Sequence, residues 1–361
     1  MTYHGAMRGA KNWSGAWRLG LQSALVLAGL VAVLMSGCQE GDTTAAEKNA
    51  APAEESARQT QAGEERVTHS GPFVRVLGTV QDGGLPHAAC HCSRCELARH
   101  DPAQRRYVAS LALVLPASGR VVVIDATPDL HPQLEQLADL RQGPEGRVDR
   151  APIDGVFLTH AHIGHYLGLA FLGFEVVHTS ELPVYCTPRM AEFLRRNGPW
   201  SQLVEKRNID LVETAPGGTA DLGDGVRVDF LQVPHRDEYS DTVGFRVHGP
   251  NRSLLYVPDT DAWSAWETPL SDVLEGVDVA ILDGSFYSLD ELPGRDISQV
   301  KHPLITVSMD LLQERVDAGR NEVYFSHLNH TNPALEPGSE ARREIQRRGF
   351  QVLAEGLEIG L

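Results

Sequence analysis

The feature that most constrains this chain is an apolar run that ends in a dense group of histidines. Residues 153–168 read "IDGVFLTHAHIGHYLG", so a buried strand over 153–159 leads directly into His160, His162 and His165. In an extended segment, residues i and i+2 point to the same side, and His165 returns to that side if a helix begins near it. Imidazoles bind zinc, iron or manganese. A chance polar turn is the alternative, but this spacing favours a metal site.

The remaining apolar patterns predict strands mixed with helices. Residues 73–80 alternate as a strand does, and residues 110–126 predict a hairpin around the turn Pro-Ala-Ser-Gly. Helical spacing of leucines or clear start and stop signals predict helices over 129–140, 187–198, 303–319 and 339–349. Further strands are expected at 226–233, 242–249, 253–259, 277–284 and 322–327, the first three as a meander.

These elements fall into two β-rich halves with interspersed helices. Such a pattern indicates an α/β fold of two sheets covered by helices on their outer faces. Nothing within residues 72–361 resembles a second linker or a repeat, and we therefore expect one folded domain there.

The N-terminal 71 residues have a different character. Arg8, Lys11 and Arg18 precede the apolar stretch "LGLQSALVLAGLVAVLMSG", which ends at Cys38. This predicts a lipoprotein signal peptide over 1–37 with lipid on Cys38, and hence a chain anchored at the periplasmic face of a bacterial membrane. A transmembrane anchor is the alternative, although the stretch is short and interrupted by glycine. Residues 39–66 contain no Val, Ile, Leu, Met or aromatic residue, so 38–71 is predicted to be a disordered acidic tether.

The charge balance excludes one class of partner. The chain has 361 residues with 48 acidic and 32 basic side chains, a formal net charge of −16. A protein that binds a phosphate backbone needs a basic face, so no nucleic-acid partner is expected. A small-molecule substrate is expected instead, and the sequence does not indicate an oligomeric state.

The histidine group resembles the first motif of the metallo-β-lactamase superfamily, His-x-His-x-Asp-His. The resemblance implies an αββα sandwich, two mixed β-sheets flanked by helices, with a dinuclear site at one edge. It also implies later ligands at strand ends. "LQVPH" supplies His235, "LLYVPDTD" supplies Asp259 with Asp261 as a nearby rival, and "VYFSH" supplies His327.

Gly164 departs from that motif, which has Asp at this position. The first metal would keep His160, His162 and His235, and the second would keep His165, His327 and the shared Asp259. Three protein ligands and a water make an ordinary catalytic zinc set. We therefore expect one or two zinc ions, one bound tightly and one more weakly, or manganese or iron in their place.

The second cluster of metal-binding side chains is "CHCSRC", which contains Cys90, Cys92 and Cys95. Three thiolates this close suit a structural zinc ion with one distant fourth ligand. A disulfide with one remaining thiol is the alternative in an oxidising compartment. His330, three residues after His327, is the preferred fourth ligand, with His91 and His87 as nearer alternatives. Cys186 follows a short apolar run and is expected to be a small buried residue.

The cysteine cluster combined with a late His-x-x-His resembles the phosphonate-pathway cyclic phosphodiesterase and, more distantly, tRNase Z. The pyrroloquinoline quinone biosynthesis B family matches more closely through "CHCSRC", "VYCTP", "ILDGSFY", "HLNHTNPALEP" and "EGLEIGL". That family usually lacks the first two histidines and retains the Asp found here as Gly164. It is also generally cytoplasmic. The chain therefore resembles a sibling branch of it.

Three functions follow as hypotheses. The preferred one is a metallohydrolase in which metal-bound hydroxide attacks a phosphodiester, ester or lactone, with Asp259 holding the water. His302, in the long polar loop 284–303, is a candidate to protonate the leaving group, although a capping role beside Pro303 is the simpler interpretation. The alternatives are iron-dependent oxidation in quinone cofactor biosynthesis and a non-catalytic lipoprotein that binds a metal or ligand.

Overall fold

The computed structural model describes residues 69–140, 151–292, 294, 296 and 300–361. The predicted signal peptide, Cys38 and the predicted tether as far as residue 68 lie outside the described residues. All of the helices and strands given below belong to the unit Arg66–Leu361. Among the described residues, no helix is both long and apolar enough to cross a membrane.

The first sheet has seven strands in the order β14-β1-β2-β3-β4-β5-β6. The predicted hairpin over 110–126 is confirmed, since β2 and β3 pair antiparallel, and β3 to β6 then run parallel. Parallel strands place their carboxyl ends at one edge of the sheet, where ligands commonly bind. The strands are β1 Phe73–Gly78, β2 Ser110–Leu115, β3 Arg120–Ile124, β4 Gly155–Phe157, β5 Leu182–Cys186, β6 Ile209–Glu213 and β14 Glu358–Gly360.

The second sheet also has seven strands, in the order β13-β12-β11-β10-β9-β8-β7. The predicted meander is confirmed by the antiparallel pairs β8–β9 and β9–β10, and β10 to β13 run parallel. The strands are β7 Thr219–Gly223, β8 Val226–Gln232, β9 Val243–His248, β10 Ser253–Val257, β11 Val279–Asp283, β12 Glu322–Ser326 and β13 Gln351–Val352.

The two sheets pack face to face over a continuous apolar interior. Phe157 of the first sheet meets Phe230 and Phe245 of the second, with ring centroids 5.8 and 5.3 Å apart. All three rings are fully buried, and β2 is buried on both faces along its whole length. Burial on both faces explains why the core strands are nearly unbroken apolar runs.

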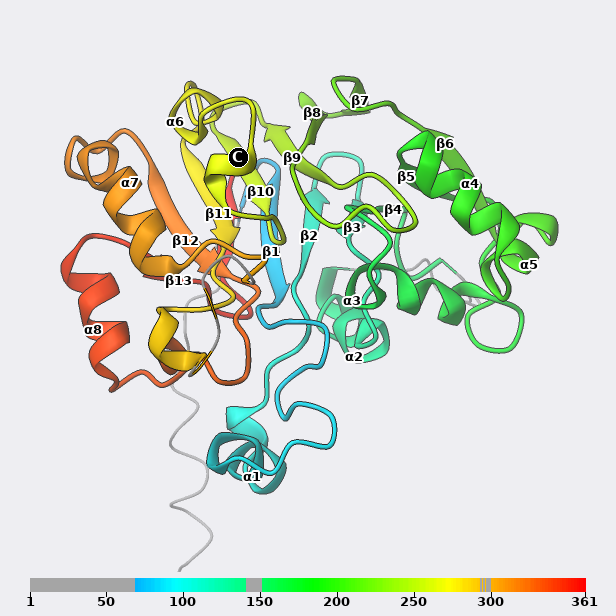
Figure 1. Cartoon of the computed structure of the whole chain (residues 1–361). Helices are drawn as coiled ribbons and strands as arrows, with labels where there is room; N and C mark the ends of the chain where they lie inside the picture. The colour runs from blue at the N-terminus through cyan, green and yellow to red at the C-terminus, as the bar shows by residue number, and fades with distance from the viewer. Residues whose placement is uncertain (1–68, 141–150, 293, 295, 297–299) are drawn as a thin grey trace, which may run out of the picture. The chain divides into compact units, whose positions relative to one another are not determined.

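Helices cover the outer face of each sheet, which confirms the predicted αββα class. Side chains from α2, α4 and α5 pack on the first sheet, and side chains from α6, α7 and α8 pack on the second. Figure 1 shows α7 and α8 on one side of the strands and α4 and α5 on the other. The helices are α1 Ser93–His100, α2 Leu130–Glu135, α3 Ile163–Tyr166, α4 Pro188–Arg196, α5 Trp200–Glu205, α6 Leu270–Val273, α7 Ile305–Asp317 and α8 Glu340–Arg347.

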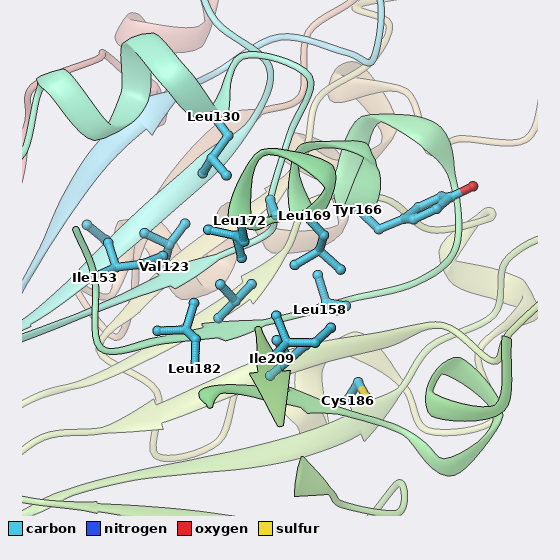
Figure 2. Close-up of a cluster of buried hydrophobic side chains, with 14 of the residues drawn as sticks. Val123, Leu130, Ile153, Leu158, Tyr166, Leu169, Leu172, Leu182, Cys186 and Ile209 are labelled. Atoms are coloured by element: carbon cyan, nitrogen blue, oxygen red, sulfur yellow. The ribbon is translucent and has the colours of Figure 1, made fainter. Parts of the chain in front are cut away.

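The cluster on the outer face of the first sheet holds the histidine turn in place. Leu158 enters this cluster before the turn, and Tyr166 and Leu169 enter it afterwards, so both ends of the segment are buried (Figure 2). Leu169 belongs to the 3₁₀ segment Leu167–Leu172 that continues α3. Cys186, the last residue of β5, belongs to the same cluster and is fully buried, as predicted (Figure 2).

Candidate metal centre

The segment that follows β4 carries three histidines whose rings lie close together. His160 is buried, His162 occupies the N-cap position of α3 with extended backbone angles, and His165 lies within α3. The ring centroids of His160 lie 4.4 Å from His162 and 4.2 Å from His165. The structure therefore brings the three predicted ligands together.

Asp259, which follows β10 of the second sheet, lies at the centre of the histidines. Its Oδ2 is 3.1 Å from Nε2 of His235, 3.4 Å from Nε2 of His160, 3.8 Å from Nδ1 of His162 and 3.9 Å from Nε2 of His165. Its predicted rival Asp261 lies behind His235, with Oδ1 3.2 Å from Nδ1 of that ring. Asp259, rather than Asp261, is therefore the carboxylate that faces the group.

His327 and His302 extend the cluster on the other side of Asp259. His327 directly follows β12 and adopts a left-handed backbone with φ of 60°, an uncommon conformation for a residue with a side chain. Nδ1 of His302 lies 3.2 Å from Oδ1 of Asp259 and 2.9 Å from Oδ2 of Asp283, the last residue of β11. Asp259, Asp283, His302 and His327 form a second group whose ligand atoms all lie within 4.8 Å of one another.

Several buried ring nitrogens in this group have no hydrogen-bond partner. They are Nε2 of His160, His165 and His327, and Oδ1 of Asp259 also lacks one. A buried polar atom without a partner costs free energy, so native proteins satisfy such atoms with another group, a water or an ion. Inward-facing nitrogens around one carboxylate fit divalent metal ions. The donors present therefore suit the metals that the sequence predicted.

A layer of polar contacts orients the histidines from behind. Asp125, which follows β3, lies with its Oδ2 2.7 Å from Nδ1 of His165 and is itself fully buried. Its Oδ1 accepts a hydrogen bond from the backbone N–H of Thr159, which holds the turn itself. Glu238 lies 3.1 Å from Nε2 of His162. Partners of this kind set the tautomer and ring orientation of histidine ligands.

Carboxylates and imidazoles lie next to one another in the cluster, and each shifts the pKa values of its neighbours. Burial opposes the charge of Asp259, but the neighbouring His302 and His327 outweigh it and hold the pKa of that carboxyl well below its usual range. Burial alone would lower the pKa of His165, whereas the charge and hydrogen bond of Asp125 raise it to about 9. For His302, Asp283 and Asp259 raise the pKa well above its ordinary value despite burial.

The sequence reasoning missed Asp82 and Asp283. Oδ1 of Asp82 lies 3.7 Å from Nε2 of both His165 and His327. Burial opposes the charge of Asp82, but these two histidines outweigh it and lower the pKa of the carboxyl. Each acid follows or ends a strand, in "VQDGG" and "AILDG", and that position was the available signal.

The cysteine cluster forms a separate group about the start of α1. The sulfur atoms of Cys90, Cys92 and Cys95 and a ring nitrogen of His330 lie within 4.8 Å of one another. The backbone N–H of His87 donates to Sγ of Cys95, and that of Cys92 donates to Sγ of Cys90. None of the four described cysteines is in a disulfide. Nδ1 of His330 is buried and unpartnered, which fits a fourth metal ligand.

The rings of the two alternative fourth ligands, His87 and His91, are not part of the sulfur group. The side chain of His91 is 82% exposed and contacts Glu96, and the ring of His87 packs on His330 at a centroid distance of 4.3 Å. The guanidinium of Arg94 donates to the backbone oxygen of His330 and ties α1 to the segment after β12. The structure thus brings His330, rather than His87 or His91, into the sulfur group.

Two stacked mixed sheets with imidazoles and carboxylates at their shared edge define an α/β sandwich with a candidate metal site at that edge. The profile of the β-lactamase superfamily domain matches residues 120–328, and the chain belongs to this superfamily. The chain is 26% identical over 316 residues to the coenzyme PQQ synthesis protein B of Cupriavidus necator, covering 80% of this chain and 99% of that protein. It is 27% identical over 309 residues to the protein of that name from Rhizobium meliloti, covering 80% and 97%.

Solved structures show the same fold. Zn²⁺-bound PqqB from Methylobacterium extorquens superimposes with a TM-score of 0.67 at 24% identity, covering 80% of this chain and all of that one. A diphosphatase from the PhnP family superimposes with a TM-score of 0.56 at 22% identity, covering 80% and 98%.

Proposed function

We propose that this protein is a metal-dependent hydrolase that cleaves a phosphodiester, an ester or a lactone. The observation that carries the proposal is the convergence of His160, His162, His235 and Asp259 from both sheets around unpartnered ligand atoms. His165 and His327 would hold a second ion beside the shared Asp259. A divalent ion held there supplies a Lewis acid and lowers the pKa of a bound water.

His302 supports the hydrolytic assignment from the other side of Asp259. Its Nδ1 is hydrogen-bonded to Oδ2 of Asp283 and lies 3.2 Å from Oδ1 of Asp259, which leaves Nε2 to donate a proton to a leaving group. The capping interpretation of His302 accounts for neither contact. Asp283 is fully buried and thus fixes the ring rather than meeting substrate.

A cavity beside His302 is the proposed binding site of the leaving group. It has a volume of about 540 Å³ and is lined by apolar side chains of the segment after Asp259 and of α7, among them Trp263, Trp266 and Leu311. An apolar wall favours substrates with an uncharged organic group. The same apolar wall does not stabilise a leaving group that carries additional charge.

The test is turnover of a panel by the zinc- or manganese-loaded protein: bis(p-nitrophenyl) phosphate, p-nitrophenyl esters and acyl lactones. We expect hydrolysis of one class, at least 100-fold slower after His162→Ala. His302→Ala should lower kcat more than it changes KM, whereas His178→Ala, outside the cluster, should change neither. Absence of turnover in the loaded protein, or activity that survives His162→Ala, would make the hydrolase assignment wrong and favour a binding protein.

The names of the relatives bring a second candidate, iron-dependent oxidation in quinone cofactor biosynthesis. The group of Asp259, Asp283, His302 and His327 offers two imidazoles and two carboxylates, a donor set that also suits iron. Metal content of the purified protein separates the two candidates. Iron with oxygen uptake on a tyrosine-derived precursor would support oxidation, and zinc or manganese without uptake would support hydrolysis.

We also propose a lipid anchor on Cys38 and a structural zinc ion at Cys90, Cys92, Cys95 and His330. "LMSGC" supports the anchor, which would place the enzyme at the periplasmic face of a bacterial membrane. Membrane fractionation with fatty-acid labelling tests it: Cys38→Ser should abolish labelling and release the chain from the membrane. Unchanged labelling would exclude Cys38 as the anchor, and retention without labelling would indicate a transmembrane anchor.

A further inference from the structure

Gly164 occupies a position where the structure leaves no room for a side chain. A Cβ at this position would lie 2.1 Å from Oδ1, 2.5 Å from Cγ and 2.9 Å from Cα of Asp82. The backbone of Gly164 lies in the short helix α3 and does not have a positive φ, so glycine is not needed there for its conformation. The requirement is one of space, and the group that fills the space is a carboxylate.

We propose that Asp82 is a ligand of the metal ion held by His165 and His327, supplied by the loop after β1 in place of a side chain at position 164. The inference rests on the proposed metal binding and names a residue of that same site. Gly164 is then not a lost ligand. The absence of a side chain at position 164 leaves room for a ligand from another segment.

The distances around Asp82 fit a shared ion better than direct hydrogen bonds. Its Oδ1 is 3.7 Å from Nε2 of His165 and also 3.7 Å from Nε2 of His327. Hydrogen bonds to ring nitrogens are shorter than about 3.2 Å. Two ligands of a tetrahedral zinc ion, each about 2.1 Å from the metal, lie roughly 3.4 Å apart. Both nitrogens are buried and unpartnered, so each lacks the partner that an ion would provide.

The loop that carries Asp82 is attached to the segment that carries His327. The backbone N–H of Gln81 donates to the backbone oxygen of Leu328, and that of Leu328 donates to the backbone oxygen of Thr79. The side-chain amide of Gln81 also donates to Oγ of Ser285, which contacts Nδ1 of His327 at 3.2 Å. Asp82 is therefore held against His327 by its neighbours, and its placement does not depend on its own weak contacts.

The direct test counts metal ions and measures their affinities in the full chain. We expect zinc-loaded wild type to hold three ions, one of them at the cysteine cluster. Asp82→Ala and Asp82→Asn should lose one ion or bind it at least 10-fold more weakly in chelator competition. The matched control is Asp101→Asn, at the N-terminus of a 3₁₀ segment (Pro102–Gln104) on the same N-terminal stretch, which should keep all three ions.

A second pair of variants separates ligation from loss of fold. Gly164→Ala places a methyl group against the Asp82 carboxylate and should lose the same ion, while circular dichroism and the cysteine-bound zinc stay unchanged. The double variant Asp82→Gly with Gly164→Asp returns a carboxylate from α3 and should restore the ion, a recovery that a merely structural Asp82 would not allow.

Two outcomes would overturn the inference: unchanged affinity for all ions in Asp82→Ala, or retention of the third ion at wild-type affinity in Gly164→Ala. Both leave the hydrolase proposal standing. If the wild type binds no ion outside the cysteine cluster, the proposed function itself fails, so the two failures are distinguishable.

Discussion

Oδ2 of Asp125 lies 2.7 Å from Nδ1 of His165, and neither side chain is exposed to solvent. Asp125 is a carboxylate and only accepts hydrogen bonds, so the contact places the proton of His165 on Nδ1. In the singly protonated ring that metal binding requires, Nε2 is then the nitrogen left to bind an ion, and it faces Asp82 and Asp259. A fully buried contact outside the ligand set thus determines which ring nitrogen can bind an ion.

Replacing this carboxylate by an amide tests that dependence. In Asp125→Asn the amide oxygen can keep the hydrogen bond from Thr159, while the NH₂ group faces Nδ1 of His165 and forces the proton onto Nε2. We expect metal affinity at the His165 site to fall about 10- to 100-fold with the fold retained. Chelator competition and circular dichroism measure the two effects. An unchanged affinity would show that Asp125 does not set the tautomer.

If the cysteine cluster binds its own zinc ion, removing one of its ligands should cause the selective loss of that ion. His330→Ala should lower the zinc content by one per chain, lower the melting temperature, and leave the ions at the histidine cluster bound. The matched control is Cys186→Ala, which removes a fully buried thiol that lies outside the cluster and should keep every ion.

Thiol titration of the unfolded, metal-free protein separates zinc binding from the disulfide alternative. Reactivity of all three clustered cysteines without a reductant is expected. Reactivity of only one of them, with no zinc in the native protein, would instead identify a disulfide.

The buried carboxyl of Glu355 should make the free energy of unfolding depend on pH without involving either metal site. Burial raises the pKa of this carboxyl to about 7, although the backbone N–H of Tyr107 donates to it at 2.6 Å. The folded chain therefore holds the proton more tightly than the unfolded chain, whose carboxyl has its ordinary pKa near 4.5. The unfolding free energy should fall as pH rises from about 4.5 to about 7 because of this group.

The variant Glu355→Gln keeps an oxygen for Tyr107 and cannot ionise. Its stability relative to wild type, measured by urea unfolding at saturating zinc, should increase from about pH 4.5 to about pH 7 and then level off. A difference that stays constant over this range would contradict the raised pKa.

Thr187 links the first helix after β5 to the buried carboxylate of Asp241. Its hydroxyl accepts from the backbone N–H of Met190 and donates to Asp241. Thr187→Ala removes the helix cap and leaves Asp241 without that donor, so we expect a loss of about 1–3 kcal/mol in unfolding free energy. Thr187→Ser keeps the hydroxyl and should recover most of that loss. Equal stabilities of the two variants would show that the hydroxyl contributes nothing.

Much of the fold could be predicted from the sequence because its core elements have clear local patterns. The hairpin of β2 and β3 has a Pro-Ala-Ser-Gly turn between two apolar runs, and α8 has a capping serine at Ser339. The four strands at the sheet edges, β6, β7, β13 and β14, were not predicted. β13 and β14 are only two and three residues long, and β7 alternates between buried and exposed residues without aromatic side chains.

Some residues of the candidate site could likewise be predicted from local sequence patterns, and others could not. His235, Asp259 and His327 could be proposed because each follows a recognisable strand and matches an expected order of ligands. Asp82 could not, because its approach to His165 depends on a loop that pairs with the segment after β12 through backbone hydrogen bonds. Pairing between segments more than two hundred residues apart has no local signal in either sequence.

His327 and His330 lie on one short segment, and each faces a different metal-binding group. That segment is tied to α1 by Arg94 and to the loop of Asp82 by Leu328. On the proposal that the cysteine cluster holds a zinc ion, oxidation or chelation that removes this ion would take away one anchor of the segment. The placement of His327 would then depend on an ion that it does not bind.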